Sequence, residues 1–397
     1  MNLINRLVLF CASLAVCQLS LAGSLEQAKR IHDRLAGTAP SEPVLLQMAT
    51  LIDDGDADAA AALAMENEGF YSATLKNWAS PWTNRDFDVF TPLNDYSATV
   101  IGLVRDEIDY REVLYGNHIY VSNASGLSAY NNSNNNHYAE LEAADISLKD
   151  TLVHRDQHSV TGLPESATSG VITSRAAAKA FFIAGTNRAQ FRYTLVNHLC
   201  MDLEQVHDVT RVPDRIRQDV SRSPGGDSRV FLNTCMGCHA GMDPLTQSMA
   251  YYDFVFDVDA DPEAELGQIE YNTDIDPETN SRVQPKYFNN DATFPYGYVT
   301  PDDTWVNYWR VGQNAVLGWD QSLNGEGEGL RSMMQELAHS EAFASCAVRK
   351  VFKQVCLRDA HDDDDLNQLQ QMQTSFVGNG HNLKSVFAQS ALYCAGN

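Results

Sequence analysis

Five consecutive residues in the second half of the chain, Cys235-Met236-Gly237-Cys238-His239, constrain its fold and chemistry more than any other segment. In a C-x-x-C-H segment, two thiols add across the vinyl groups of a haem and the following imidazole binds the iron. A redox C-x-x-C would need a thioredoxin-like alternation of strands and helices, and a zinc site would need a second Cys or His pair. Neither pattern is visible. The segment therefore predicts one covalent haem c, held by Cys235 and Cys238, with His239 as the proximal iron ligand.

The sixth iron ligand must approach from the face of the porphyrin opposite His239. Met242 is unsuited, because a residue three positions after the proximal histidine is tied to the same face. We interpret Met242 as a packing residue, with Asp243-Pro244 setting the turn that follows. Further candidates are His198, Met201, Met333, Met334 and His339. We favour Met334 as the distal ligand, because it lies on a predicted helix just after a glycine-rich loop.

The first 22 residues have the features of a secretory signal peptide. One positive charge is followed by an apolar run, and the small residues Ser20 and Ala22 precede a cut at Gly23. A lipoprotein signal fits less well, since Val16 rather than a small residue precedes Cys17. No later stretch approaches the ~20 apolar residues that a membrane helix needs. We therefore expect an exported protein without an integral membrane segment, located in the periplasm or outside the cell.

Export to an oxidising compartment favours disulfides among the cysteines outside the signal and the C-x-x-C-H segment. Four remain, and they allow three pairings: Cys200, Cys346, Cys356 and Cys394. Cys346 and Cys356 lie on one predicted helix, about 15 Å apart at ~1.5 Å per residue, which is beyond the reach of a disulfide. If this helix turns back into the one at 383–393, Cys394 arrives beside Cys346. We therefore favour Cys346–Cys394 and Cys200–Cys356.

The hydrophobic periodicity predicts a mainly α, multi-module protein with long irregular loops. Apolar residues recur at helical spacing in four stretches, 25–68, 174–200, 330–357 and 366–393, and at Tyr96 to Arg105. Polar, aperiodic segments at 122–164 and 257–303 predict loops, and the glycines at 325, 327 and 329 predict a hinge. The expected modules are a signal peptide (1–22), an N-terminal helical module (23–121), a loop-rich connection (122–170), a cytochrome c-like haem module with an irregular excursion (171–324) and a C-terminal helical module (325–397).

The charge balance argues against one class of partner. Lys and Arg total 28 against 52 Asp and Glu, which gives a formal net charge of -24. A protein with this charge is unsuited to binding nucleic-acid phosphates. Two other patterns suggest metal binding, but we interpret them as surface features. His154 and His158 are four residues apart without a nearby acid on a firm helix. The acidic runs at 257–261 and 362–365 lack the glycine and distal glutamate of an EF-hand.

The haem segment continues as CMGCHAGMDP, and in this form it resembles the cytochrome-type segment of the planctomycete-type families of secreted haem proteins, which are functionally uncharacterised. The C-terminal stretch from HSEAFASC to SALY is similar to the helical module that follows in those chains. The segments IHDRLAG and NDYSATVIGLVRD are similar to parts of the helical module that precedes the haem segment in those chains. Thr246 departs from the family, which usually has glycine there. The resemblance implies a mostly helical c-type haem protein and transfers no established reaction.

Three functions fit such a chain. A low-spin haem with two axial ligands would make it an electron carrier that exchanges electrons with a redox protein or a small redox molecule. An open distal site would make it a haem peroxidase or oxidase. The third is a surface or complex-forming subunit with a largely structural haem, because most of the chain lies outside the haem segment. We favour electron transfer.

Overall fold

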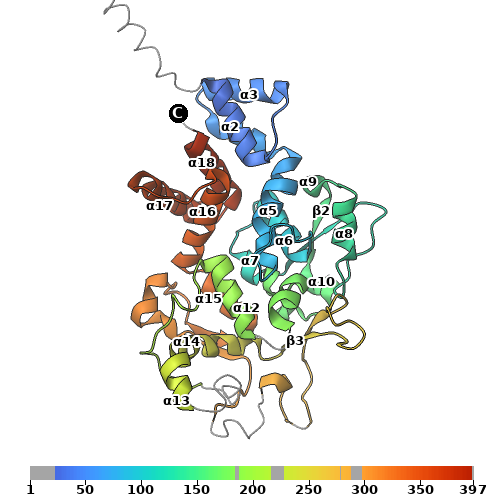
Figure 1. The fold of residues 1–397 in the computed structure, drawn as a ribbon, viewed down its shortest axis with the longest axis vertical. Coiled ribbons are helices and arrows are strands. Elements are labelled where there is room, and N and C mark those ends of the chain that lie inside the picture. The colour runs from blue at the N-terminus through green and yellow to red at the C-terminus, as the bar shows by residue number, and fades with distance from the viewer. Residues whose placement is uncertain (1–22, 184–186, 216–227, 278, 288–296, 396–397) are drawn as a thin grey trace, which may run out of the picture.

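The computed structural model describes residues 23–183, 187–215, 228–277, 279–287 and 297–395, and the expected signal peptide lies outside these ranges. Helices dominate the described chain, so the predicted mainly α class is confirmed. None of the described helices is long and apolar enough to cross a bilayer. Figure 1 shows an elongated molecule, with the first helices at one end and Met236–Thr246 (α14), the helix of the C-x-x-C-H segment, toward the other.

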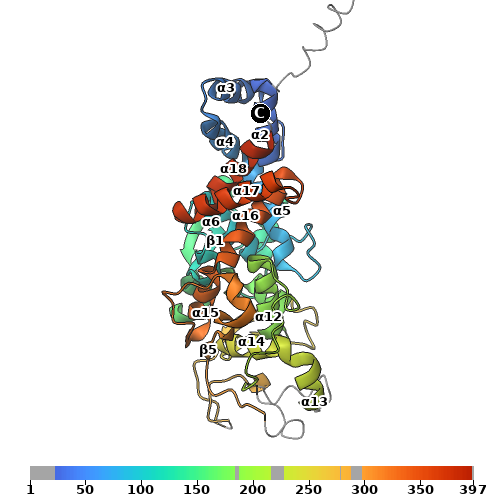
Figure 2. The same cartoon turned by 90° about the vertical axis from the view of Figure 1, so that its left-hand side faces the viewer.

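Three helices form the N-terminal end of the described chain, as the apolar periodicity predicts. They pack on one another and on the last helix of the chain, which Figures 1 and 2 place beside them. Gly37 ends the first helix with a φ of 68°, a left-handed conformation that favours glycine at a helix C-terminus. The three helices are Ser24–Ala36 (α2), Glu42–Asp53 (α3) and Ala57–Met65 (α4).

A buried helix, Asp95–Arg105 (α6), forms the centre of the next region. Every residue from Asp95 to Val104 is buried, and Asn94 and Ser97 form a reciprocal capping box at its start. The helix therefore matches the one predicted at Tyr96 to Arg105. Short helical elements surround it: Phe70–Leu75 (η2), Lys76–Ala79 (α5), Ser80–Thr83 (η3) and Glu112–Tyr115 (α7).

The polar segment after residue 122 differs from the long loop that its composition suggests. Its side chains satisfy backbone groups instead of facing only water. The Ser122 N–H donates to His137 Nε2 over 2.9 Å, and the Tyr138 hydroxyl donates to the Tyr120 carbonyl over 2.8 Å. The segment contributes the strand Leu152–Asp156 (β2), which pairs antiparallel with His118–Ser122 (β1), and three short helices: Asn136–Ala143 (α8), Leu148–Thr151 (α9) and Gln157–Thr161 (α10).

The described parts of the segment from Glu165 to Thr246 contain short helical elements, which alternate with irregular stretches and lead into the C-x-x-C-H segment. The expected helical stretch at 174–200 is helical in its described parts. The elements are Glu165–Ala167 (η4), Gly170–Thr173 (η5), Arg175–Ala177 (α11), Ala178–Phe182 (η6), Asn187–Thr194 (α12), Leu195–Leu199 (η8), Ser228–Val230 (α13), Phe231–Cys235 (η10) and Met236–Thr246 (α14).

The segment after α14 is largely irregular, as its composition predicts, but it contains two small antiparallel strand pairs. The glycine-rich stretch at 325–329 is not an open hinge, because its centre pairs with Thr304–Val306 as a short strand. The elements are Gln247–Met249 (η11), Tyr252–Val255 (β3), Gln268–Tyr271 (β4), Pro285–Tyr287 (η12), Thr304–Val306 (β5), Tyr308–Arg310 (η13), Gly312–Leu317 (η14) and Glu326–Glu328 (β6).

The C-terminal helices return to the N-terminal end and share its core. Arg30 donates to the Ala395 carbonyl over 2.9 Å, and Arg34 donates to the Val355 carbonyl over 2.8 Å. One continuous cluster of buried apolar side chains includes residues from Ala28 to Ala395, so it crosses the expected module boundaries, which stay predictions. The four helices are Gly329–Ala338 (α15), Glu341–Cys356 (α16), Asp363–Gly378 (α17) and Leu383–Ala395 (α18).

Candidate functional site

The C-x-x-C-H segment spans the junction of η10 and α14. Cys235 is the N-cap of α14, and Cys238 and His239 lie in its first turn. Because side chains three and four residues apart share one side of a helix, the start of α14 presents the two thiols and the imidazole as neighbours. The three predicted site residues are therefore brought together by local structure alone.

The disulfides leave both thiols of the segment available. Among the described cysteines, four form the pairs Cys200–Cys346 and Cys356–Cys394, and only Cys235 and Cys238 are free. The thiol of Cys238 is half-buried and donates to the Leu203 carbonyl over 3.4 Å. Burial raises the pKa of the Cys238 thiol. The thiol form is therefore favoured over the nucleophilic thiolate that a redox C-x-x-C uses.

The pairing expected from the sequence, Cys346–Cys394 with Cys200–Cys356, is wrong. The physical reason is the helix α17, which lies between α16 and α18 in the sequence. Because α17 reverses the chain direction, α18 runs alongside α16 in the same direction, and Cys394 arrives at the end of α16 that carries Cys356. Cys346, near the other end of α16, is left to face Cys200 at the end of η8. The predicted separation of Cys346 from Cys356 does hold.

A buried carboxylate orients the imidazole of His239. The His239 Nδ1 atom lies 3.1 Å and 3.2 Å from the two oxygens of Asp243, one helical turn further on. The Asp243 side chain is only 2% exposed. A carboxylate accepts a hydrogen bond, so the proton of the neutral imidazole resides on Nδ1, and Nε2 carries the lone pair that can bind a metal.

The same carboxylate is anchored from a second helix. Arg188 in α12 binds Asp243 with both arms of its guanidinium, at 2.9 Å from Nε and 2.8 Å from Nη2. This bidentate geometry fixes the carboxylate and spreads its charge. Arg188 was not predicted from the sequence, and Asp243-Pro244 was assigned to a turn after the motif. That assignment is wrong, because both residues lie inside α14, which continues to Thr246. The i, i+4 spacing of His239 and Asp243 was the available signal.

Two glycines let bulky side chains contact the backbone of α14. A Cβ atom on Gly237 would lie 2.1 Å from His207 Nε2, and one on Gly241 would lie 1.9 Å from Trp309 Nε1. Trp309 is fully buried, and its indole N–H has no hydrogen-bond partner in the described part of the chain. His207 and Trp309 pack on the motif helix through contacts between segments far apart in the sequence, and no local pattern indicates them.

The structure places the distal candidates in different surroundings. Met333 and Met334 are both fully buried in α15. This helix packs on η11, the turn that directly follows α14. His198 is held elsewhere: its Nε2 pairs with the Tyr96 hydroxyl at 2.7 Å, and burial lowers its pKa to about 3. Met242 is 2% exposed and belongs to the core. Met334 as the distal ligand stays a prediction.

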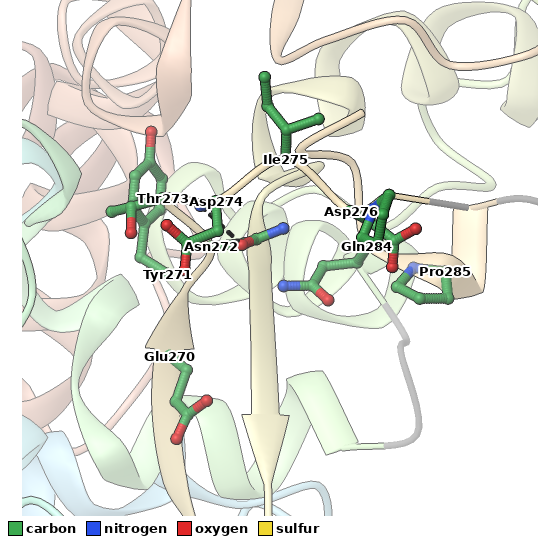
Figure 3. Close-up of a pocket in the computed structure, with 10 residues that line it drawn as sticks. Glu270, Tyr271, Asn272, Thr273, Asp274, Ile275, Asp276, Gln284 and Pro285 are labelled. Carbon is green, nitrogen blue, oxygen red and sulfur yellow. Dashed lines mark hydrogen bonds between the residues drawn. The ribbon is translucent and has the colours of Figure 1, made fainter. Parts of the chain in front are cut away.

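A separate pocket of about 520 Å³ lies along β4 and the loop after it (Figure 3). Its lining mixes carboxylates, amides and one aromatic ring, and it contains no residue of the C-x-x-C-H segment. Arg282 stacks nearby on Tyr251, with its guanidinium carbon 4.1 Å from the ring centroid. Residues that line the pocket include Glu270, Tyr271, Asn272, Asp274, Asp276 and Gln284.

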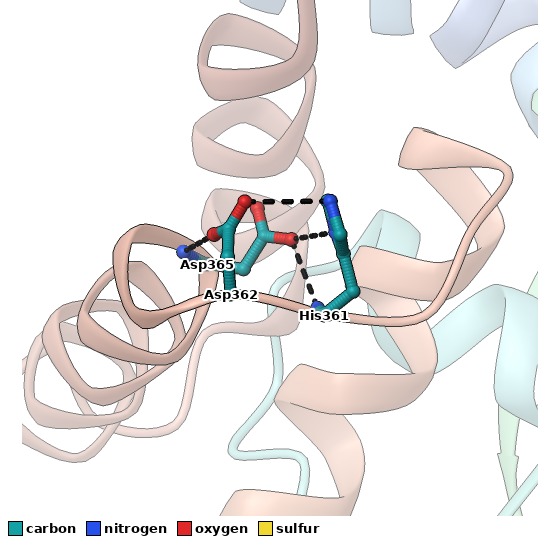
Figure 4. Close-up of side chains that lie close together, drawn as sticks. All are labelled: His361, Asp362 and Asp365. Atoms are coloured by element: carbon teal, nitrogen blue, oxygen red, sulfur yellow. Dashed lines mark hydrogen bonds and ion pairs between the residues drawn. The ribbon is translucent and has the colours of Figure 1, made fainter.

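The acidic runs serve local structure. Figure 4 shows His361, Asp362 and Asp365, whose ligand atoms lie within 4.8 Å of one another. Arg358 also donates to Asp365, so a guanidinium already neutralises this carboxylate. The run at 257–261 caps its own loop, since Asp257 accepts the backbone N–H groups of residues 259 and 260. Asp257 and Asp259 are exposed, as expected of a surface run, whereas Asp365 is buried and paired with Arg358, so the surface interpretation fails for this one residue.

The comparisons add no relative. No protein-family model, no curated protein and no solved structure matches this chain.

Proposed function

We propose that the chain binds one haem c and works as an exported electron-transfer protein. Cys235 and Cys238 form the two thioether bonds, and Nε2 of His239 binds the iron. The observation that carries the proposal is the donor set at the start of α14. Two thiols remain free while the other four described cysteines pair, and the neighbouring imidazole has its Nδ1 held by Asp243. A haem c needs this combination of groups.

Exposed apolar side chains near the motif also support the proposal. Four apolar side chains in the segments that flank α14 are between 41% and 62% exposed: Val209, Val212, Val230 and Leu232. Leu203 and Asp208, in the same segment as Val209, contact Cys238 and Gly237 respectively. A haem bound at the motif would remove apolar surface of this kind from water, and each square ångström buried contributes about 25 cal/mol.

The bound haem supplies a one-electron change at its iron. The protein residues determine its environment. Asp243 accepts the hydrogen bond from Nδ1, fixes the ring orientation of His239 and makes the imidazole a stronger electron donor. Arg188 moderates this effect, because its charge offsets that of the carboxylate. The partner of the proposed carrier is a redox protein or a small redox molecule. The two disulfides agree with export to the periplasm or beyond.

The contact between His239 and Asp243 also favours a second function, that of a haem peroxidase or oxidase. A carboxylate behind the proximal histidine stabilises iron in its higher oxidation states, which suits chemistry with peroxide or oxygen. This function requires an open distal position. The resemblance of CMGCHAGMDP to planctomycete-type secreted haem proteins remains part of the proposal and does not separate the two functions.

The test is an absorption spectrum of the exported protein in both oxidation states, combined with a pyridine haemochrome assay. We expect a c-type haemochrome with one haem per chain and a low-spin spectrum. The Cys235→Ala/Cys238→Ala variant loses covalent attachment, and His239→Ala loses the low-spin spectrum. A high-spin spectrum that responds to peroxide supports the enzyme instead. Protein matured in a host that attaches haem c, yet without covalent haem, overturns both functions.

A further inference from the structure

The β1–β2 hairpin brings together two histidines that lie 36 residues apart in the sequence. His118 Nδ1 is 2.8 Å from His154 Nε2. In the strand register His118 faces Asp156, so His118, His154 and Asp156 project from the same face of the hairpin. His154 is exposed, and the His118 side chain is 18% exposed. An ion in solution can therefore reach the pair.

A glutamate fixes the hydrogen-bonding state of His118. Oε2 of Glu112 lies 2.5 Å from His118 Nε2. The carboxylate accepts this hydrogen bond, so Nε2 of the neutral ring carries the proton and Nδ1 presents a bare lone pair toward His154. This arrangement is the carboxylate–histidine pair that stands behind most metal-binding histidines, where the carboxylate orients the ring and makes it a better ligand.

We propose that His118 and His154 form a binding site for a divalent transition metal ion, Zn²⁺ or Cu²⁺. His118 Nδ1 and His154 Nε2 are the protein ligands, and Glu112 is the supporting carboxylate. In the metal-free pair the Nε2–H of His154 donates to His118 Nδ1, so this proton moves to Nδ1 of the His154 ring when the metal binds. Two nitrogen ligands at ~2.05 Å from a tetrahedral ion are about 3.3 Å apart, so the present separation needs to open by only about 0.5 Å. Imidazole nitrogen suits both metals.

The surroundings favour a cation at this position. The carboxylates of Asp106 and Asp156 act electrostatically on His154, whereas Arg155 opposes them. Asp156 does not form a three-ligand group with the two histidines within 4.8 Å.

The site differs from the histidine pair that the sequence suggests. His154 and His158 are close in sequence, but His154 lies in β2, whereas His158 lies in α10 and pairs with the side chain of Asn117 at 2.8 Å. His158 is therefore a matched control, because it is a nearby histidine outside the proposed ligand set.

Zinc titration calorimetry on the purified protein tests the proposal, with a parallel titration of Cys235→Ala/Cys238→Ala, which removes the motif thiols as competing ligands. We expect one zinc ion to bind to both proteins at the hairpin with a micromolar Kd. His118→Ala and His154→Ala should each raise this Kd at least tenfold. Glu112→Gln should raise it about tenfold, and His158→Ala should leave it unchanged.

Electron paramagnetic resonance with Cu²⁺ gives a second readout. The intact site should show hyperfine coupling to two imidazole nitrogens, and either histidine variant should show at most one. Melting curves without metal verify that each variant folds. Zinc binding that survives both histidine substitutions, or equal losses with His158→Ala, overturns the proposal. The result does not depend on the haem, because the variant without motif thiols is titrated in parallel.

Discussion

At the scale of single residues, two buried aspartates show how a neighbouring cation determines the role of a carboxylate. Asp243 and Asp365 are each about 98–99% buried, and each is bound by both arms of an arginine. Asp243 also accepts a hydrogen bond from the proposed iron ligand, whereas Asp365 accepts one from the Tyr393 hydroxyl. The first aspartate therefore acts on the proposed site, and the second acts on the stability of the C-terminal helices.

Substitution of Asp243 by asparagine tests its action on His239. A neutral acceptor makes a weaker hydrogen bond to Nδ1, by about 1 kcal/mol, so the imidazole donates less electron density and the oxidised iron is less stabilised. We expect Asp243→Asn to raise the reduction potential by roughly 50 mV, since ~59 mV corresponds to a tenfold change for one electron. Spectroelectrochemical titration measures this shift.

Arg188→Gln provides the control for the sign of that shift. Removal of the guanidinium leaves the negative charge of Asp243 less compensated, so the potential should fall. Melting curves establish that both variants are folded. A potential that moves in the same direction in both variants would contradict the proposed roles of Asp243 and Arg188.

Asp365 makes the free energy of unfolding depend on pH in the acidic range. Its hydrogen bonds from Arg358 hold its pKa below the ordinary value of 3.8. A carboxyl group whose pKa is lower in the folded state contributes stability above the unfolded pKa, and this contribution is lost as the pH falls through the folded value. Asp365→Asn should therefore cost about 2 kcal/mol at pH 7, and the difference from wild type should shrink below about pH 4.

Urea denaturation at several pH values measures this difference. Asp364→Asn is the matched control, because Asp364 lies in the same first turn of α17 but is exposed. Its effect at pH 7 should be small. A difference between Asp365→Asn and wild type that stays constant from pH 7 to pH 2 would refute the role of the ion pair with Arg358.

At the scale of secondary-structure elements, α14 depends on the absence of side chains at two positions. The clustering of the three site residues at its start follows from their spacing in the local sequence. The packing of α14 against the rest of the protein does not follow from local sequence, because it requires His207 and Trp309 to approach Gly237 and Gly241. The sequence gives no indication of these partners, since they come from segments 30 or more residues before and 68 or more residues after the glycines they contact.

Gly241→Ala tests this packing of α14. The added Cβ would lie 1.9 Å from Trp309 Nε1, so α14 or the indole must move. We expect a loss of about 1–3 kcal/mol in the free energy of unfolding, as in overpacked cores, together with lower haem incorporation. Gly378→Ala in α17 is the control, because nothing lies within 4 Å of the position that its Cβ would take and alanine has the higher helix propensity. If both variants are equally stable, close packing at Gly241 is not required.

At the scale of the whole molecule, the two disulfides tie regions that are distant in sequence. Cys200–Cys346 closes a loop of 146 residues between the middle of the chain and α16, and Cys356–Cys394 closes one of 38 residues between α16 and α18. Together with the contacts of α2 to the C-terminal helices, they join the two ends of the chain to the part that precedes α14.

Loss of the longer crosslink should therefore destabilise the protein more. In the loop-entropy model, removal of Cys200–Cys346 costs about 5 kcal/mol and removal of Cys356–Cys394 about 4 kcal/mol. Denaturation of the two double-alanine variants measures the order. Peptide mapping under non-reducing conditions tests the connectivity directly, and recovery of a Cys346–Cys394 peptide would contradict the pairing described above.

The sequence by itself determined the helical class, most of the long helices and the grouping of Cys235, Cys238 and His239. These depend on residues within one or two helical turns, where spacing dictates which side chains meet. Only the tertiary structure decided the disulfide partners, the anchoring of Asp243 by Arg188 and the pairing of His118 with His154. Each of these contacts joins segments whose relative direction and register depend on packing across the whole core, and local periodicity carries no information about either.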